Sequence, residues 1–305
     1  MRNAFMNTIF DACGKQDDIF IISGDAGLGV FDDFKEQYPD RFLNLGVAEQ
    51  NMASFGAGLA IAGYKVCLYN IIPFLLYRCY EQVRNDICYQ RLPVILAGIG
   101  SGITYAPQGF THYSIEDIGI ARTLPNLTVI SPIDPVEAKC AARYALDADV
   151  PVYVRLAKRG EPVFHKTDDI DITMPQVLRA GEDIAILFHG TVSQEVMNAY
   201  DDLVNIQINP MVVSVPMLQP LNTEALKNIL KKVKKVISVE EHYGNSGLGA
   251  ILANIILLCN IPVTLSILDI QYKLIHEVRN QHCMREHFGI SAEHIKKNVM
   301  TLLEN

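Results

Sequence analysis

Short apolar runs rich in β-branched residues alternate along the chain with longer segments whose apolar positions recur at helical spacing. This alternation is typical of α/β units, in which buried parallel strands are followed by covering helices. The helices expected in the first half are 3–13, 49–62 and 74–89. The runs predicted as strands are 19–23, 42–45, 65–69, 93–98, 128–130, 152–156, 184–188, 211–215, 236–240 and 263–268.

A change of composition near the middle of the chain separates two such sets. Residues 158–176 contain Gly160, Pro162 and a cluster of acidic residues, a composition typical of a linker. We therefore predict an α/β protein of two domains, a first domain at 1–165 and a smaller second domain at 175–305.

Composition narrows the class of protein. Of the 305 residues, 50% are hydrophobic and 20% are charged, the balance of a globular protein, and the net charge of −8 argues against a nucleic-acid partner. No apolar run reaches the roughly 18 residues of a membrane helix, and the first residues do not resemble a secretory signal. The seven cysteines form no CxxC pair, which favours buried thiols in a reducing cytoplasm.

Glu49 is the first candidate for chemistry. It follows a predicted strand that ends near Gly46, and it opens a predicted helix made almost wholly of small and apolar residues. An acidic residue in a first helical turn often only complements the helix dipole. A helix of this composition must be buried, however, so Glu49 is expected at the edge of a core, where a carboxylate is a candidate for proton transfer.

Short motifs that occur in order over nearly the whole chain carry a specific resemblance. They are Gly24-Asp25, Arg41-Phe42-x-Asn44-x-Gly46-x-x-Glu49-Gln50, Ala57-Gly58-Leu59-Ala60-x-x-Gly63, Arg78-Cys79-Tyr80-Glu81-Gln82-Val83, Leu92-Pro93-Val94, Gly109-Phe110-Thr111-His112, Leu124-Pro125-Asn126, Ser131-Pro132-Ile133-Asp134-Pro135-Val136-Glu137, Val154-Arg155 and Glu240-Glu241-His242. In these motifs the chain is similar to the pyrimidine-binding domain of transketolases and deoxyxylulose phosphate synthases, followed by the transketolase C-terminal domain. The resemblance implies that 1–165 is a parallel-sheet pyrimidine-binding domain and that 175–305 is the smaller α/β C-terminal domain.

The resemblance implies thiamine diphosphate as cofactor and assigns Glu49 its catalytic role. In the family a glutamate shares a proton with N1′ of the cofactor's pyrimidine, so that the 4′-amino group becomes basic enough to deprotonate the thiazolium C2. For the aromatic residue that stacks on the pyrimidine we expect Phe74, with Tyr77 as second candidate. An ungapped registration places Leu75 at that position instead.

The same resemblance implies substrate contacts from two regions. His112, in Gly-Phe-Thr-His, corresponds to a family histidine that faces the substrate and the reacting carbon. Gln108 stands where transketolases carry an acidic residue that binds the donor sugar. Arg155 and Arg159 follow the last strand of the first domain, where relatives place an arginine for the substrate phosphate, and arginine suits such anions.

Other positions depart from the family pattern. A family histidine that helps to hold the sugar phosphate is replaced by Gly100, and an expected serine is replaced by Gly29. Together with Gln108, these changes predict that the natural substrate is an unusual sugar or a sugar from a specialised biosynthetic pathway.

The sequence predicts no metal site of its own. Gly24-Asp25-Ala26 with Asn51 imitates the Gly-Asp-Gly and Asn motif that holds magnesium and diphosphate, but it lacks the third glycine. We therefore expect Mg²⁺ to be held mainly by a partner subunit that carries the diphosphate-binding domain. The expected assembly is α2β2, with a homodimer of this chain inside it.

The predicted function is that of the C-terminal, pyrimidine-side subunit of a split transketolase, which moves a two-carbon ketol unit between sugars or sugar phosphates. The first alternative is the β subunit of the first component of a 2-oxoacid dehydrogenase, which has the same two-domain plan. The second alternative is a non-catalytic interaction subunit.

Overall fold

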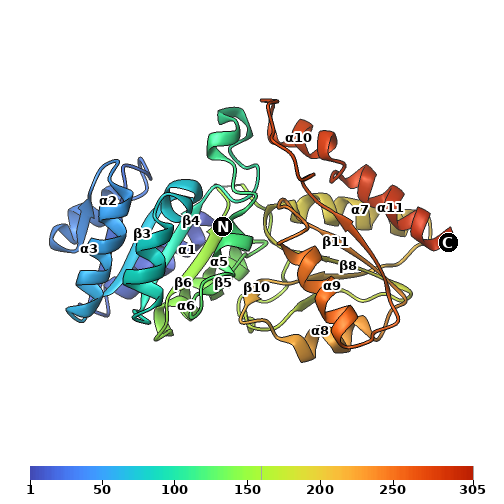
Figure 1. Cartoon of the computed structure of the whole chain (residues 1–305), viewed down its shortest axis with the longest axis horizontal. Coiled ribbons are helices and arrows are strands. Elements are labelled where there is room, and N and C mark those ends of the chain that lie inside the picture. The colour runs from blue at the N-terminus through green and yellow to red at the C-terminus, as the bar shows by residue number, and fades with distance from the viewer. Residues whose placement is uncertain (159, 305) are drawn as a thin grey trace.

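The chain folds into two α/β units that lie side by side in the computed structural model, which describes residues 1–158 and 160–304 (Figure 1). Within these residues the first sheet has seven strands and the second has five. The strands of the first sheet are β1 (Ile19–Ser23), β2 (Phe42–Asn44), β3 (Lys65–Ile71), β4 (Val94–Ile99), β5 (Thr128–Ile130), β6 (Val152–Leu156) and β10 (Met217–Gln219). Those of the second are β7 (Gln176–Arg179), β8 (Ile184–Phe188), β9 (Met211–Ser214), β11 (Lys235–Val239) and β12 (Thr264–Leu268).

The two sheets are mainly parallel, as predicted. The first has the order β10-β5-β6-β4-β3-β1-β2, and the second has the order β12-β11-β8-β9-β7. Only the edge strands β10 and β7 pair antiparallel in the described part of the chain. The ten strands predicted from the sequence are all present, with bounds that differ by at most two residues at either end.

Both antiparallel strands escaped sequence analysis. β10 lies between Pro216 and Pro220 and has three residues, too few for a periodic signal. Although it comes from the second half of the chain, β10 adds to the first sheet, where Met217 pairs with Ile130. The two units therefore share backbone hydrogen bonds.

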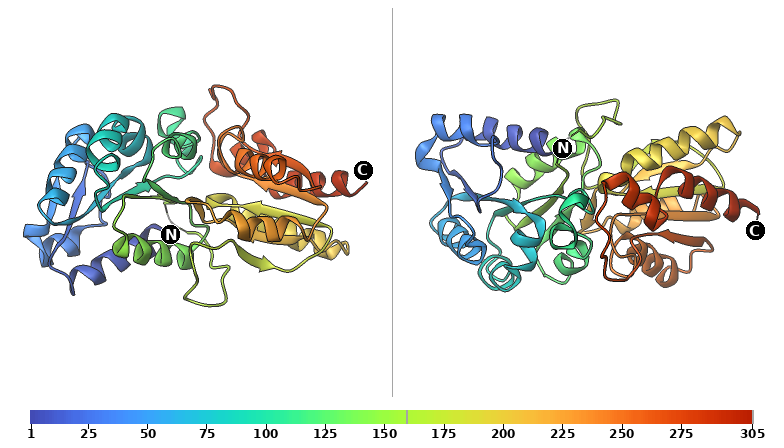
Figure 2. Two further views of the ribbon diagram at one scale, coloured as in Figure 1. Left: turned by 60° about the horizontal axis from the view of Figure 1, so that its bottom comes forward. Right: turned by 90° about the horizontal axis from the view of Figure 1, so that it is seen from above.

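Helices cover both faces of each sheet (Figures 1 and 2). On the first sheet, α1 and α6 pack together on one face, and α3 and α5 lie on the opposite face. On the second sheet, α8 and α9 oppose α7 and α11. The helices are α1 (Arg2–Cys13), α2 (Asp32–Gln37), α3 (Glu49–Ile61), α4 (Tyr80–Gln82), α5 (Asp117–Ala121), α6 (Pro135–Asp147), α7 (Ser193–Asn205), α8 (Thr223–Leu230), α9 (Leu248–Leu258), α10 (Gln281–Phe288) and α11 (Ala292–Glu304).

The expected helix 74–89 is not a regular α-helix. Wider π-helical turns occupy Pro73–Tyr77 and Val83–Cys88, on either side of α4. In each π-helical turn a backbone N–H donates a hydrogen bond to the carbonyl five residues earlier. These bonds run from Arg78 N to Pro73 O and from Tyr89 N to Arg84 O. Such turns change which side chains share a face, and they recur at functional sites.

Candidate active site

A cavity of about 360 Å³ lies at the carboxyl ends of β1, β3, β4 and β6. Ligands of open parallel sheets bind at this edge. Glu49, Phe74 and Arg78 line the cavity, together with the glycine-rich turn that follows β1. Each of its lining residues precedes residue 159, so the second domain supplies none of them within the described chain.

Glu49 is the first residue of α3 and is only 3% exposed. Its Oε2 accepts a hydrogen bond from Nη1 of Arg78 at 2.7 Å, so a buried carboxylate is paired with a half-exposed guanidinium. The other oxygen, Oε1, has a long contact of 3.4 Å with Nδ2 of Asn70. Glu49 can therefore accept a further hydrogen bond from a ligand at Oε1 while Arg78 compensates its charge.

Glycine at position 24 allows Glu49 and Asn70 to approach the turn after β1. A Cβ at Gly24 would clash with Nδ2 of Asn70 and would lie 3.4 Å from Cγ of Glu49. Instead, Nδ2 of Asn70 donates to the carbonyl of Gly24 at 3.1 Å. On the same edge, Oδ1 of Asn44 accepts from the backbone N–H groups of Asp25 and Gly46, which ties this turn to the segment that leads into α3.

Aromatic contacts connect Glu49 to His112. The guanidinium of Arg78 lies over the Phe74 ring at 4.5 Å, and the ring of Phe74 meets that of His112 edge to face at 5.3 Å. The centre of the Tyr105 ring lies 6.3 Å from that of the His112 ring. The structure thus brings together Glu49, Phe74 and His112, which are far apart in the sequence.

The other candidates for the pyrimidine contact do not reach the cavity. Tyr77 points to a neighbouring cavity, where its hydroxyl donates to Glu116 Oε2 at 3.0 Å. Leu75 is buried in the core at 1% exposure. Of the three candidates, Phe74 alone lines the cavity with Glu49, and we withdraw Tyr77.

Arg155 cannot serve as the predicted substrate ligand. Its side chain has no exposed surface, and its Nε donates to Asp117 Oδ2 at 2.8 Å. Nη2 donates to the carbonyls of Ser114 and Glu241, which places the guanidinium between the two domains. A strand residue with its side chain directed into this contact looks the same in sequence as one directed toward a ligand. Arg159 lies outside the described residues.

The remaining predicted substrate residue does not line the cavity, whereas two unpredicted cations do. Gln108 is exposed in the segment that carries His112. Arg2 and Lys158 line the cavity, and Lys158 Nζ lies 5.4 Å from the centre of the Tyr105 ring. Neither cation belongs to a family motif, so the sequence offered no signal for them. Arg78 does belong to a motif, Arg78–Val83, but the resemblance assigned it no role.

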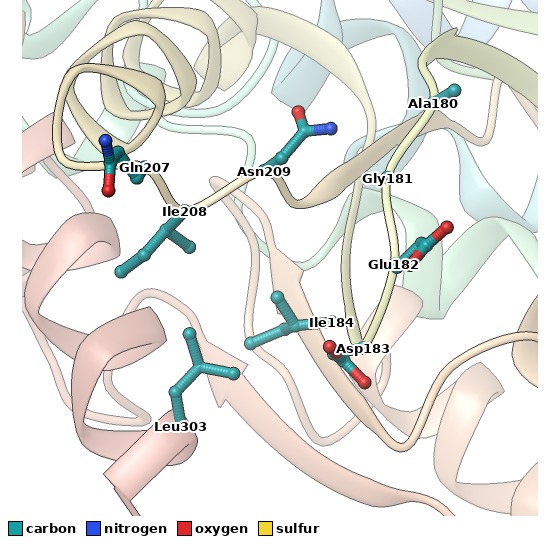
Figure 3. A pocket seen from close by; sticks show the side chains of 9 residues that line it. All are labelled: Ala180, Gly181, Glu182, Asp183, Ile184, Gln207, Ile208, Asn209 and Leu303. Carbon is teal, nitrogen blue, oxygen red and sulfur yellow. The ribbon is translucent and has the colours of Figure 1, made fainter.

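A second cavity, of about 490 Å³, lies at the amino-terminal ends of β8 and β9 (Figure 3). Glu182 and Asp183 are on its rim, opposite Ile208 and Leu303. This is the end of a parallel sheet away from the usual ligand edge, so the cavity near Glu49 is the better candidate.

The described residues include no cluster of three or more His, Cys, Asp or Glu residues that could hold a metal ion. None of the helices found in them is both long and apolar enough to cross a membrane.

Comparison with known proteins agrees with this architecture. The family model "Transketolase, pyrimidine binding domain" matches residues 1–161, and "Transketolase, C-terminal domain" matches 175–295. An apulose-4-phosphate transketolase subunit of Actinobacillus succinogenes is 39% identical over 274 residues, covering 88% of this chain and 87% of its own. A 6-deoxy-6-sulfo-D-fructose transketolase subunit of a Clostridium species is 30% identical over 309 residues, covering all of this chain and 94% of its own.

Solved structures show the same fold. A chain described as "Split gene transketolase, inactive beta4 tetramer" aligns with a TM-score of 0.87 and 27% identity, over 98% of this chain and 96% of that one. The transketolase of Campylobacter jejuni aligns with a TM-score of 0.82 and 18% identity, over 98% of this chain and 46% of that one. The chain therefore belongs to the transketolase family and corresponds to the C-terminal, pyrimidine-side section of a split transketolase.

Proposed function

We propose that this chain supplies the pyrimidine half of a thiamine diphosphate site and becomes active only with a partner that carries the diphosphate-binding domain. The observation that carries the proposal is the cavity in which a buried carboxylate, Glu49, lies beside the Phe74 ring. The cavity suits the apolar, hydrogen-bonding end of this cofactor. Gly24-Asp25-Ala26 lacks the third glycine of the family motif that holds magnesium and diphosphate, so the proposal assigns that end of the cofactor to the partner.

The proposed division of labour follows from that fit. When bound, the cofactor supplies a thiazolium carbanion that takes up and releases the ketol unit. Glu49 holds a proton at Oε1 for exchange with pyrimidine N1′, and Arg78 compensates the charge at Oε2. Phe74 packs on the pyrimidine ring. His112, whose ring contacts Phe74, faces the substrate, and Gln108 lies in the same segment.

The substrate is proposed to be a ketose with an anionic group. Arg2 and Lys158 line the cavity that holds Glu49, and both are cations available to a phosphate or sulfonate. The relatives named above act, by their names, on a phosphorylated sugar and on a sulfonated sugar. Because Arg155 is buried, these two cations replace it in the proposal.

For the assembly we propose an α2β2 heterotetramer in the cytoplasm, with a homodimer of this chain at its centre and Mg²⁺ in the partner. One structural relative that spans the same region is described as an inactive beta4 tetramer. All seven cysteines are free thiols and five of them are buried, which suits a reducing compartment.

Neither alternative function has a specific observation in its favour. The relatives named above are transketolase subunits, which argues against a dehydrogenase β subunit. A non-catalytic subunit would not need a buried carboxylate at the ligand edge of the sheet.

Reconstitution tests the proposal. The chain is mixed with a diphosphate-domain subunit of a split transketolase, and ketol transfer from a panel of phosphorylated and sulfonated ketoses is measured with thiamine diphosphate and Mg²⁺. Transfer is expected in the mixture and in neither subunit alone. Activity of this chain without a partner would contradict the partner requirement, and a folded, cofactor-loaded complex without transfer would favour the non-catalytic alternative.

A further inference from the structure

The loop that carries His112 is closed at its base. Residues 100–115 connect β4 to α5, and this loop rises between the two domains, beside the segment that precedes α10 (Figure 1). Ser114 N donates to Gly102 O at 2.9 Å, and the Ser114 hydroxyl donates to Gly100 O at 3.0 Å. The position of His112 therefore depends on how this base is held.

Glu241 of the second domain holds the base of the 100–115 loop. Its side chain is 1% exposed, and its Oε2 accepts from Ile103 N at 3.2 Å. A Cβ on Gly102, which has a φ of +61°, would clash with the same oxygen. The carboxylate thus occupies space that only glycine leaves free, and it bonds to the residue that follows.

Arg285 in turn fixes Glu241. Its Nε donates to Glu241 Oε1 at 2.5 Å, and its Nη2 donates to the carbonyl of Thr191 at 2.6 Å. The Thr191 hydroxyl donates to Glu241 Oε2 at 2.7 Å. Burial opposes ionisation of Glu241, but Arg285 and Thr191 outweigh it and lower the pKa of this carboxyl. Glu241 is consequently a charged acceptor in one fixed orientation.

We propose that Glu241, oriented by Arg285, is a positioning residue of the transketolase reaction that places His112 through the base of the 100–115 loop. The second domain lends no described residue to the cavity wall, so this contact gives it a part in catalysis. The inference rests on the proposed function in one respect, the assignment of His112 to the substrate.

Hydrogen exchange of the full chain tests the contact without any activity assay. Glu241→Gln weakens the acceptor for Ile103 N and leaves Glu195, 3.4 Å from Nη1, as the charged partner of Arg285. We expect amides 103–114 to exchange about 10-fold faster in this variant. The matched control is Glu240→Gln, since Glu240 is equally buried but bonds to His189, Leu248 and Gly249 within the second domain. Unchanged exchange of the loop in folded Glu241→Gln, or equal acceleration in the control, would overturn the proposal.

A second variant approaches the contact from the loop. Gly102→Ala retains the Glu241 and Arg285 side chains but places a methyl group where it clashes with the Glu241 carboxylate, and it serves if Glu241→Gln does not fold. The same acceleration of exchange in 103–114 is expected, and wild-type exchange in this variant would count against the proposal.

Kinetics of the assembled enzyme separate positioning from general stability. Glu241→Gln should raise the KM for the ketose and lower turnover about 10-fold, with the affinity for thiamine diphosphate unchanged. In a His112→Ala background the same substitution should have no further effect on turnover, because the two act through one group. Additive losses would refute the proposed route. Absence of transfer by the wild-type complex would contradict the proposed function instead, while the exchange measurement still decides the role of Glu241.

Discussion

Glu49 carries the most specific prediction at the scale of single residues. Glu49→Gln keeps the shape of the side chain and its contact with Arg78, but an amide cannot hold the exchangeable proton. Turnover of the assembled enzyme at saturating cofactor should fall at least ~10²-fold, as for loss of a general acid–base group. Steady-state kinetics give the measurement, and Glu81→Gln, an exposed glutamate on α4, serves as control. Near-normal turnover in Glu49→Gln would refute the assignment.

His112 is predicted to act on the substrate rather than on the cofactor. Its ring lies at the edge of Phe74, outside the cavity that holds Glu49. His112→Ala should therefore lower turnover or raise the KM of the ketose about 10-fold or more, with little change in cofactor affinity. Calorimetry of the complex with thiamine diphosphate, beside initial-rate kinetics, separates the two. The control is His282→Ala, an exposed histidine of α10. Loss of cofactor affinity with turnover intact would show that His112 serves the cofactor.

The sequence was informative about the site where a motif reported local geometry. Glu49 follows a strand end and opens a helix of small residues, and its burial follows from that composition. The predicted role of Arg155 as a substrate ligand does not fit the structure, for the opposite reason. The direction of its side chain, toward Asp117, depends on the packing of the two domains. Arg2 and Lys158 reach the cavity from segments far apart in the chain, and no local pattern reports such a meeting.

At the scale of elements, strands with continuous apolar runs were predicted closely because a strand buried on both faces leaves little ambiguity. β8, for example, has five buried residues and the bounds expected from its sequence. The segment 74–89 was predicted as one helix because hydrophobic spacing does not distinguish α from π turns. That difference matters, since the π-helical turn at Pro73–Tyr77 lies where Phe74 and Arg78 face the cavity while Tyr77 does not.

The contact between the linker and helix α6 of the first domain is predicted to weaken as the pH rises. His165 lies between two carboxylates of the α6 terminus, 2.9 Å from Asp134 and 3.5 Å from Glu137. Burial raises the pKa of Glu137 to about 7. Burial opposes the charge of His165, but the hydrogen bond to Asp134 and the charge of Glu137 outweigh it and raise its pKa.

Both shifts have the same sign for stability. Each group binds its proton more tightly in the folded chain, so its stabilisation is complete below the ordinary pKa, 4.5 for Glu137 and 6.5 for His165, and is lost as the pH rises through the folded value. The free energy of unfolding should fall by on the order of 2 kcal/mol between pH 5 and pH 8 through this pair. In Glu137→Gln, which imitates the protonated acid, the fall should be smaller. Urea unfolding at several pH values measures both, and parallel pH profiles would disprove the linkage.

At the scale of the whole molecule, the two domains behave as one packed body. One apolar cluster runs from α3 and α5 on the first sheet to α8 and α9 on the second. β10 extends the first sheet, and Gln219 Nε2 donates to the carbonyls of Leu124 and Leu127. The proposed division at 165 and 175 therefore follows the linker and not the hydrogen-bonded sheets. Because the two domains share a core and a sheet, the second domain can affect the site without lining the cavity.

The last prediction concerns the chain without its partner. The cavity offers a carboxylate and an aromatic ring to the pyrimidine, but Gly24-Asp25-Ala26 lacks the third glycine of the motif that holds magnesium and the diphosphate. Charge-assisted and metal contacts are stronger than neutral ones, so most of the cofactor's binding energy should come from the partner. Isothermal calorimetry of the lone chain with thiamine diphosphate and Mg²⁺ should show no appreciable binding, and the same titration with the partner present should show one site per chain.

Sedimentation of the same samples checks the assembly. The lone chain should form a homo-oligomer, as the beta4 state of its structural relative illustrates, and addition of the partner should convert it to α2β2. The partner must then cover the exposed side chains of Leu28, in the turn after β1, and Val47, just before α3. We expect it to do so with an obligate-type interface. Leu28→Glu should accordingly weaken assembly at least about 10-fold and leave the fold intact, whereas Leu258→Glu, at the far end of α9, should not. Tight cofactor binding by the lone chain would show that both halves of the site reside in it, because a half-site lacks the contacts that hold a diphosphate.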